Sequence, residues 1–200
     1  FKKEIVKKAI ENELKRNGQV YFLHNRVETI NGFKLSIENL KTRAKIGILH
    51  AKLLDKEIIK VLSDFQNNKI NLLLATTIIE NGLDISNANT LIVDNATRLG
   101  LAQAYQLRGR IGRGNAQANA FFLYPKGQLK GLAKQRLLAL QQAEELGSGY
   151  KIAQADLEIR GAGNILGREQ SGSVNKIGLN LYCQMLSEAV EKLKSEHRPL

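Results

Sequence analysis

Five short apolar runs, separated by segments of helical character, restrict the fold of this chain more than any other feature. The runs cover residues 19–23, 45–49, 71–75, 90–93 and 119–124. They are apolar almost throughout rather than alternately apolar and polar, so the strands they form must be covered on both faces. Strands that alternate with helices assemble into a parallel sheet with helices on both sides. We therefore predict an α/β fold built on a parallel sheet flanked by helices.

The segments between the runs supply the helices. The first helix is expected over 2–16, with an apolar face of Ile5, Val6, Ala9, Ile10 and Leu14. A second is expected over about 27–41, where Gly32 costs about 1 kcal/mol relative to alanine. A third is expected to begin at a capping Asp55. Its apolar face is formed by Ile58, Ile59, Leu62 and Phe65. Another helix is expected over about 100–109.

Polar residues follow four of the runs directly. They are His24, Asn25 and Arg26 after the first run, His50 after the second, Thr76 and Thr77 after the third, and Asp94 after the fourth. The carboxyl ends of parallel strands meet at one edge of a sheet, and the ligands of such sheets bind beyond that edge. We therefore predict that the binding site lies there.

An arginine-dense stretch, Gln-Leu-Arg-Gly-Arg-Ile-Gly-Arg, occupies residues 106–113. The planar guanidinium of arginine matches phosphate oxygens, and glycine lets a backbone come close to a ligand. Arg110 and Arg113 are three residues apart, which would place both on one helical face and direct them into one cleft. Taken alone, the stretch can also be a solvated basic turn. Its place after three other polar strand ends favours phosphate binding.

The composition agrees with a polyanionic partner but does not prove one. The formal net charge is +11, which favours nucleic acid only modestly because a lysine-rich composition can have other origins. No apolar run has the length of a membrane span, and the N-terminus has neither an initiator Met nor a signal-peptide segment. We therefore expect part of a longer cytoplasmic protein.

No metal site is expected. The single cysteine, Cys183, excludes an internal disulfide and a cysteine-based zinc cluster, and its apolar surroundings favour packing. His24 and His197 lack partners at the spacing of metal ligands and receive no role.

The character of the chain changes after Pro125. Three helices are expected in this part, over 130–146, 150–159 and 177–194. A glycine-rich stretch over 160–172 precedes the last of them. We place a boundary near residue 126, with one domain over 1–126 and a helical extension over 127–200.

Four stretches resemble, in order, the motifs of the second RecA-like lobe of superfamily 2 helicases and translocases. Residues 19–25 resemble motif IV, 47–50 the DNA-contacting motif after it, 75–86 motif V and 106–113 motif VI. Each match is weak alone, but four in this order at predicted strand ends make a specific signal. The resemblance implies that the predicted parallel sheet is RecA-like.

The resemblance continues into the extension. Residues 156–172, which contain Arg-Gly-Ala-Gly-Asn-Ile-Leu-Gly-Arg-Glu-Gln, look like the motif called TRG, for translocation in RecG. RecG and the transcription-repair-coupling factors share this motif, and both are double-stranded DNA translocases. Residues 171–190 look like the coupling factors rather than RecG. The resemblance therefore implies a TRG helical hairpin and a C-terminal helix within 127–200.

The same resemblance implies roles at a nucleotide site. Arg110 and Arg113 match arginine fingers, which in well-studied enzymes contribute roughly 10³–10⁵ in rate. Gly82 and Asp84 match the segment that contacts the ribose, although Asp84 can also cap a helix or turn, and Gln106 matches a residue beside the nucleotide. The chain has no G-x-x-x-x-G-K-[ST] loop and no D-E-x-[HQ] box. ATP and Mg²⁺ would therefore be bound mainly by a first lobe.

Two further sets of residues take implied roles. Those implied to contact DNA are Asn25, Arg26, His50, Thr76 and Thr77. Those implied to couple ATP hydrolysis to movement along the duplex are Arg108, Arg136, Arg160 and Gln170. Alternatives stay open for three of these features. Thr77 can be a simple helix cap, His50 can be structural, and residues 160–163 can be only a tight turn. Ala51 stands where the family usually has glycine.

As a whole, the resemblance implies the C-terminal motor lobe of an ATP-dependent double-stranded DNA translocase that displaces stalled RNA polymerase and couples transcription to nucleotide-excision repair. Contacts with RNA polymerase and excision-repair proteins would lie outside this chain. A RecG-type fork-remodelling helicase and a non-catalytic duplex-DNA-binding module are the alternatives. Because the phosphate-binding loop is missing, the chain alone is expected neither to hydrolyse ATP nor to move DNA.

Overall fold

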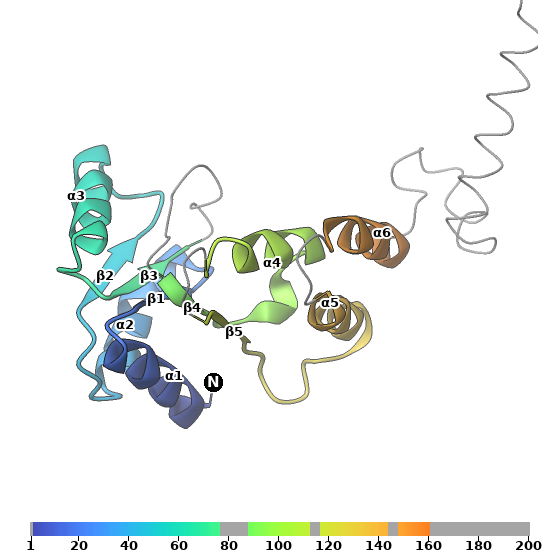
Figure 1. The fold of residues 1–200 in the computed structure, drawn as a ribbon, viewed down its shortest axis with the longest axis horizontal. Helices are drawn as coiled ribbons and strands as arrows, with labels where there is room; N and C mark the ends of the chain where they lie inside the picture. Colours follow the sequence, from blue (N-terminus) through green and yellow to red (C-terminus); the bar gives the residue numbers. More distant parts are fainter. Residues whose placement is uncertain (1, 77–87, 113–116, 144–147, 161–200) are drawn as a thin grey trace, which may run out of the picture. The chain divides into compact units, whose positions relative to one another are not determined.

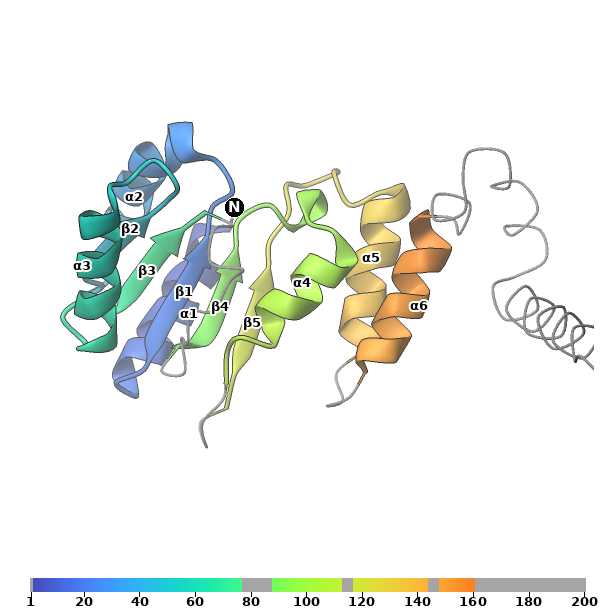
Figure 2. The same cartoon turned by 90° about the horizontal axis from the view of Figure 1, so that it is seen from above.

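A five-stranded parallel sheet organises the part of the chain that the computed structural model describes, residues 2–76, 88–112, 117–143 and 148–160 (Figures 1 and 2). Its strands are β1 (Gln19–Leu23), β2 (Ile46–Leu49), β3 (Leu72–Ala75), β4 (Ala88–Val93) and β5 (Asn119–Phe122). Their order is β2-β3-β1-β4-β5, and every neighbouring pair is parallel. The predicted α/β fold and all five of its strands are confirmed.

Helices lie between and after these strands. The described helices are α1 (Lys3–Lys15), α2 (Ile30–Glu38), α3 (Asp55–Gln66), α4 (Leu101–Arg108), α5 (Gly131–Gln142) and α6 (Gly149–Arg160), with 3-10 turns η1 (Val27–Thr29) and η3 (Ala96–Arg98). Each corresponds to a predicted helix, with ends that differ by a few residues. The helix expected over 27–41 starts as η1 and stops at Glu38, because Lys41 has a φ of +54° that a right-handed helix cannot contain. The helix expected over 177–194 lies outside the described residues.

Side chains of the central strands point alternately to the two faces of the sheet. One face packs against α1 and α2, and its strand residues are Val20, Phe22, Leu72, Leu74 and Ile92. The opposite face is covered at β2 by α3, since a Cβ built on Gly47 would lie 3.3 Å from the Val61 side chain. Figure 1 shows α1 and α2 on one side of the sheet and α3 on the other. Coverage of both faces explains why the strands are apolar throughout.

The buried face of α1 differs from the expected one in two residues. Four of the expected residues pack into the core: Val6, Ala9, Ile10 and Leu14. Ile5, by contrast, is 40% exposed, and Glu13 is 1% exposed. The Glu13 carboxylate accepts hydrogen bonds from Arg16 and from the Thr90 hydroxyl, which offset the cost of burying a charge. A Cβ on Gly18 would lie 1.7 Å from Glu13 Oε1, so this glycine leaves the space that the carboxylate occupies.

Two expectations for α3 are wrong. Asp55 is the first helical residue, and the cap position belongs to Leu54, whose backbone N–H donates to the Glu57 carboxylate over 2.9 Å. Ile59 is 66% exposed, and Val61 faces the sheet in its place. Positions 58, 61, 62 and 65 follow the i, i+3, i+4, i+7 spacing of one helical face, whereas position 59 does not.

The chain forms two compact units, Phe1–Leu137 and Leu138–Leu200, with the division inside α5. The first unit contains the whole sheet, and α6 belongs to the second. Residues 161–172 of the glycine-rich stretch lie outside the described residues, and the domain boundary near residue 126 remains a prediction. None of the described helices is both long and apolar enough to cross a membrane.

Candidate functional site

The carboxyl ends of the strands meet at one edge of the sheet, as expected, and the strand order sets which residues are neighbours there. Across the edge the order is His50 after β2, Thr76 after β3, His24 after β1 and Asp94 after β4. Backbone hydrogen bonds continue the sheet by one residue: Thr76 N–H to Leu49 O at 3.1 Å, His24 N–H to Ala75 O at 2.8 Å and Asp94 N–H to Leu23 O at 3.0 Å. At about 4.8 Å per strand, the row spans roughly 14 Å.

His24, which received no role in the sequence analysis, lies between Thr76 and Asp94 in this row. Its side chain is 8% exposed, and its Nδ1 lies 2.7 Å from Asp94 Oδ2. Its Nε2 lies 2.8 Å from the Thr29 hydroxyl, and its ring stacks on Phe33 with centroids 4.3 Å apart and planes 14° from parallel. Because a carboxylate only accepts hydrogen bonds, Nδ1 carries a hydrogen. The only sequence signal for this arrangement was that His24 and Asp94 both follow predicted strands.

His50 lies at the β2 end of the row and is half-buried. Its Nδ1 accepts the backbone N–H of Lys52 over 3.2 Å. In the neutral ring the hydrogen is therefore on Nε2, which makes that nitrogen a donor. A donor at the end of a strand suits a phosphate oxygen. The DNA contact of His50 stays a prediction.

Thr76 is buried, with 4% of its surface exposed. Its backbone N–H is used within the sheet, but its hydroxyl oxygen has no hydrogen-bond partner in the described part of the chain. A buried hydroxyl without a partner costs about 1–3 kcal/mol. The hydroxyl is therefore suited to bond either a ligand or the adjoining segment 77–87, which lies outside the described residues and includes Thr77, Gly82 and Asp84.

Exposed polar residues extend the site beyond His24. Asn25 and Arg26 are both exposed at the start of η1. Glu28 lies next to them, 3.6 Å from Lys52 Nζ. A hydrogen bond from its own backbone and the charge of Lys52 hold the pKa of Glu28 below its ordinary value. This part of the edge thus contains both a carboxylate and several basic groups.

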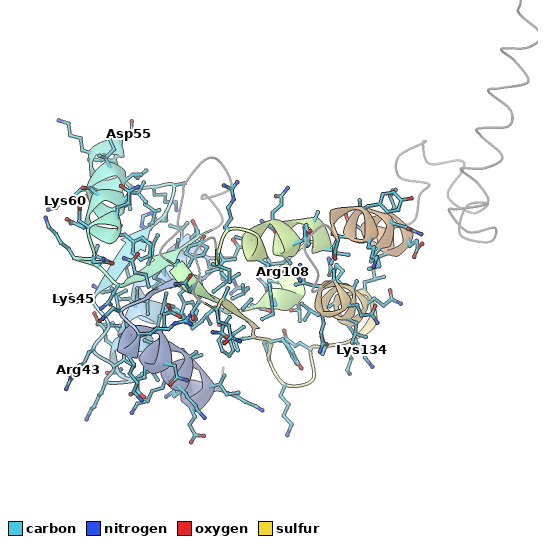
Figure 3. The ribbon with its side chains drawn as sticks, in the orientation of Figure 1. Arg43, Lys45, Asp55, Lys60, Arg108 and Lys134 are labelled. Carbon is cyan, nitrogen blue, oxygen red and sulfur yellow. The ribbon has the colours of Figure 1, made fainter. Side chains whose placement is uncertain are left out.

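The arginine-dense stretch begins on α4, which packs against the protein through Leu101, Ala104 and Leu107. Gln106 is consequently exposed, and Arg108, labelled in Figure 3, is half-buried. The Arg108 guanidinium lies 5.1 Å from the centre of the Tyr105 ring. Such a distance is that of a cation–π contact. The position of Gln106 beside the nucleotide and the coupling role of Arg108 stay predictions.

The expectation that Arg110 and Arg113 share a helical face is wrong. Helix α4 ends at Arg108, and Gly112, between the two arginines, has a φ of +72°. A Cβ on Gly112 would lie 2.4 Å from Ala118 Cβ, so only glycine fits there without rearrangement. Arg110 is held by its backbone N–H bond to Leu107 O at 3.1 Å and by the buried Ile111 that follows it. Arg113 lies outside the described residues.

Arg136 on α5 reaches the turn that follows β4. Its guanidinium donates to the Thr97 carbonyl over 3.3 Å. The Thr97 hydroxyl in turn donates to Asn95 Oδ1 over 2.7 Å, which stabilises the turn internally. Of the other residues expected to couple hydrolysis to movement, the Arg160 side chain and Gln170 lie outside the described residues. Within the described residues there is no group of three histidine, cysteine or acidic side chains that could hold a metal ion.

Comparison with known proteins connects this chain to a family. The model for the helicase conserved C-terminal domain matches residues 2–115. The transcription-repair-coupling factor of Borreliella burgdorferi is 49% identical over 193 residues, which cover 96% of this chain and 17% of that protein. The transcription-repair-coupling factor of Bacillus subtilis is also 49% identical over 193 residues, covering 96% of this chain and 16% of that protein.

A solved structure agrees with these sequence matches. The structure of RecG bound to a three-way DNA junction matches with a TM-score of 0.67 and 29% identity, over 81% of this chain and 21% of that chain. The match extends beyond the share of the chain that the domain model covers. The chain spans only 16% to 17% of the length of the two coupling factors.

Proposed function

Because the chain belongs to the helicase conserved C-terminal domain family, we propose that it is the second motor lobe of an ATP-dependent double-stranded DNA translocase that couples transcription to repair. The observation that carries the proposal is the single sheet edge that brings three of the motif segments together. Similarity to transcription-repair-coupling factors over 96% of the chain supports the choice within the family. In that role the complete protein displaces stalled RNA polymerase and engages excision-repair proteins through other regions.

The nucleotide side of the site uses the arginine-dense stretch. A guanidinium is always charged and offers a planar set of donors, so Arg110 is suited to neutralise the charge that develops on the transferred phosphoryl group. The left-handed turn at Gly112 and the buried Ile111 hold its backbone in place. ATP and Mg²⁺ are bound mainly by a first lobe, and Gly82, Asp84 and Gln106 complete the site together with Arg113.

The DNA side uses the carboxyl edge of the sheet, where His50 and Thr76 lie. His50 Nε2–H and the Thr76 hydroxyl are donors suited to phosphate oxygens, and Asn25, Arg26 and Thr77 extend this surface. Contacts of this kind do not read bases, so binding is independent of sequence and weakens as salt rises. The related RecG structure contains DNA, which supports a DNA partner here.

Movement requires that changes at the nucleotide reach the DNA. Arg136 contacts the turn after β4, which leads directly into α4 and its arginines. We assign Arg108, Arg136, Arg160 and Gln170 to this coupling. RecG-type fork remodelling is the second candidate, favoured by the RecG match, but the identity of 29% is well below the 49% to coupling factors.

Substitution of Arg110 in the full-length protein tests the proposal. Arg110→Ala should lower the DNA-stimulated ATP hydrolysis rate by roughly 10³-fold or more, while the Kd for duplex DNA changes less than about threefold, because this arginine does not contact DNA. The matched control is Arg43→Ala, at an exposed arginine that precedes β2 and lies away from the carboxyl edge of the sheet. Triplex displacement measures movement in the same samples. Unchanged hydrolysis in Arg110→Ala would contradict the assignment.

A further inference from the structure

We propose that His24 is a positioning residue of the motor: through Asp94 it fixes the turn after β4 on which Arg136 docks, and it thereby supports the coupling of ATP hydrolysis to DNA movement. The inference rests on the function proposed above but concerns a residue that lies within the motif IV stretch and received no role of its own from the sequence.

The contacts of His24 fix its ring completely. The ring lies between Asp94 and Thr29, with heavy-atom distances of 2.7 Å and 2.8 Å, and is stacked on Phe33. In the neutral ring with its hydrogen on Nδ1, that hydrogen is donated to the Asp94 carboxylate and Nε2 accepts from the Thr29 hydroxyl. Both ring nitrogens are therefore used, and the stacking partner sets the plane of the ring. Because three contacts fix the His24 ring, the ring can in turn fix the position of the Asp94 carboxylate.

The partner that matters is the turn after β4, residues 94–98. Its backbone is attached to β1 by Asp94 N–H and to the β5 side by Ala96 N–H, which donates to Leu123 O over 2.8 Å. The side-chain attachment is the hydrogen bond that His24 Nδ1–H donates to the Asp94 carboxylate. Asp94 is thus tied to the centre of the sheet twice, through its backbone and through its carboxylate. Loss of the second tie leaves the first residue of the turn free to rotate its side chain and loosens the residues after it.

Arg136 approaches this turn from α5. Its donor group lies 3.3 Å from the carbonyl oxygen of Thr97, three residues after Asp94. A continuous path of contacts therefore runs from Thr29 through His24 and Asp94 to the turn and Arg136. If the Thr97 carbonyl is held in place, a displacement of Arg136 is transmitted to the turn; if the carbonyl moves freely, it is not. We therefore assign His24 to the coupling of hydrolysis to DNA movement and not to ATP hydrolysis itself.

Helix α4 is anchored independently of this path. Its residues Leu101, Ala104 and Leu107 are all buried. These apolar contacts keep the helix, and the arginine-dense stretch after it, against the protein when the bond between His24 and Asp94 is removed. Disruption of His24 should therefore reduce movement more than hydrolysis. A residue that served only general packing would reduce both together.

The test uses His24→Phe, His24→Asn and His24→Gln in the full-length protein, with thermal unfolding measured for each. Phenylalanine keeps the ring and its stacking but has no donor. Asparagine places an amide N–H at the position of Nδ1, and glutamine reaches the position of Nε2 instead. The measured quantities are the ATP hydrolysis rate and the rate of triplex displacement, whose ratio reports the coupling. Lys134→Ala, at an exposed residue on the helix of Arg136, is the control (Figure 3).

We expect His24→Phe and His24→Gln to lower the coupling ratio about tenfold, the effect of losing one hydrogen bond to a charged group, with hydrolysis changed less than about twofold. His24→Asn should restore most of the ratio. In the double variant His24→Phe with Arg136→Ala, the ratio should be no lower than in Arg136→Ala alone, because the two residues act through one path. Three outcomes would overturn the inference. The double variant could show a coupling ratio lowered by the product of the two single effects, or the hydrolysis rate could fall in parallel with movement. The ratio could also be restored by His24→Gln and not by His24→Asn.

Amide hydrogen exchange of the same full-length variants separates this inference from the proposed function. Exchange over 94–99 should accelerate in His24→Phe and remain as in the unaltered protein in His24→Asn. If the unaltered protein hydrolyses ATP but moves no DNA, the proposed function fails, and the exchange result still decides whether His24 positions the turn. Unchanged exchange in His24→Phe would refute the positioning itself.

Discussion

Alanine at Gly112 should destabilise the protein by about 2–5 kcal/mol. Two separate effects add at this position. The backbone φ of +72° lies in the left-handed region, which costs an L-residue about 1–2 kcal/mol. A Cβ there would also lie 2.4 Å from Ala118 Cβ, well inside van der Waals contact, and overpacking of this kind costs about 1–3 kcal/mol. The sum is a large part of the stability of an ordinary domain.

Urea unfolding of Gly112→Ala measures this cost, and a second glycine isolates its two parts. Gly127 has a φ of +81°, but a Cβ there would meet nothing within 4 Å. Gly127→Ala should therefore show the backbone cost alone, about 1–2 kcal/mol. Adding Ala118→Gly to Gly112→Ala should recover the difference, because it removes the other methyl group of the clash. The steric argument would be refuted if Gly112→Ala and Gly127→Ala lowered the free energy of unfolding by amounts that agree within about 0.5 kcal/mol. It would also be refuted if Ala118→Gly restored none of the free energy of unfolding lost in Gly112→Ala.

Two further predictions concern stability and charge. Gln19→Ala should destabilise the protein by about 2–4 kcal/mol in urea unfolding. The buried Gln19 amide donates to two backbone carbonyls, at 2.6 Å and 2.9 Å, and both carbonyls lose a partner in the variant. The control is Gln66→Ala, at an exposed glutamine, which should cost less than about 0.5 kcal/mol in the same experiment. The pKa of Glu28 lies below its ordinary value of 4.5, mainly because of a backbone hydrogen bond and secondly because of the charge of Lys52. The stabilisation that the ionised Glu28 contributes is therefore present above pH 4.5 and is lost as pH falls through the lowered pKa. Lys52→Ala should raise that pKa only partway in an NMR titration, and added salt should do the same, whereas complete recovery would show that the backbone bond contributes nothing.

The fold was predictable because its signals are local. Each strand is a continuous apolar run, and a run is readable without knowledge of its neighbours. The errors came from residues whose environment is set by distant parts of the chain. Glu13 is a charged residue at a core position, which is stable only because Thr90 and Arg16 bond its carboxylate and Gly18 makes room for it. Helical periodicity cannot reveal such compensation.

The edge at which the strand-end residues meet was predictable, but the contacts between them were not. That His24 and Asp94 lie at one edge follows from parallel strands, but that they touch follows from β1 and β4 being neighbours in the sheet. The two residues are seventy positions apart, and alternation of strands and helices leaves the strand order open. A search for metal-ligand spacing overlooked His24 for this reason. Its partners are an acid on another strand and a hydroxyl in the following turn, neither of which forms a sequence motif with it.

The arginine-dense stretch shows where the geometric reason given for two predicted site residues is wrong. A spacing of three places two side chains on one face only within a helix, and the left-handed turn at Gly112 interrupts any helix between Arg110 and Arg113. The position of Arg110 is instead set by the Leu107 carbonyl and the buried Ile111 on either side of it. A change at Gly112 should therefore alter the relation between the two arginines more than it moves Arg110. Loss of hydrolysis in Gly112→Ala with an unmoved Arg110 would mean that both arginines must act together.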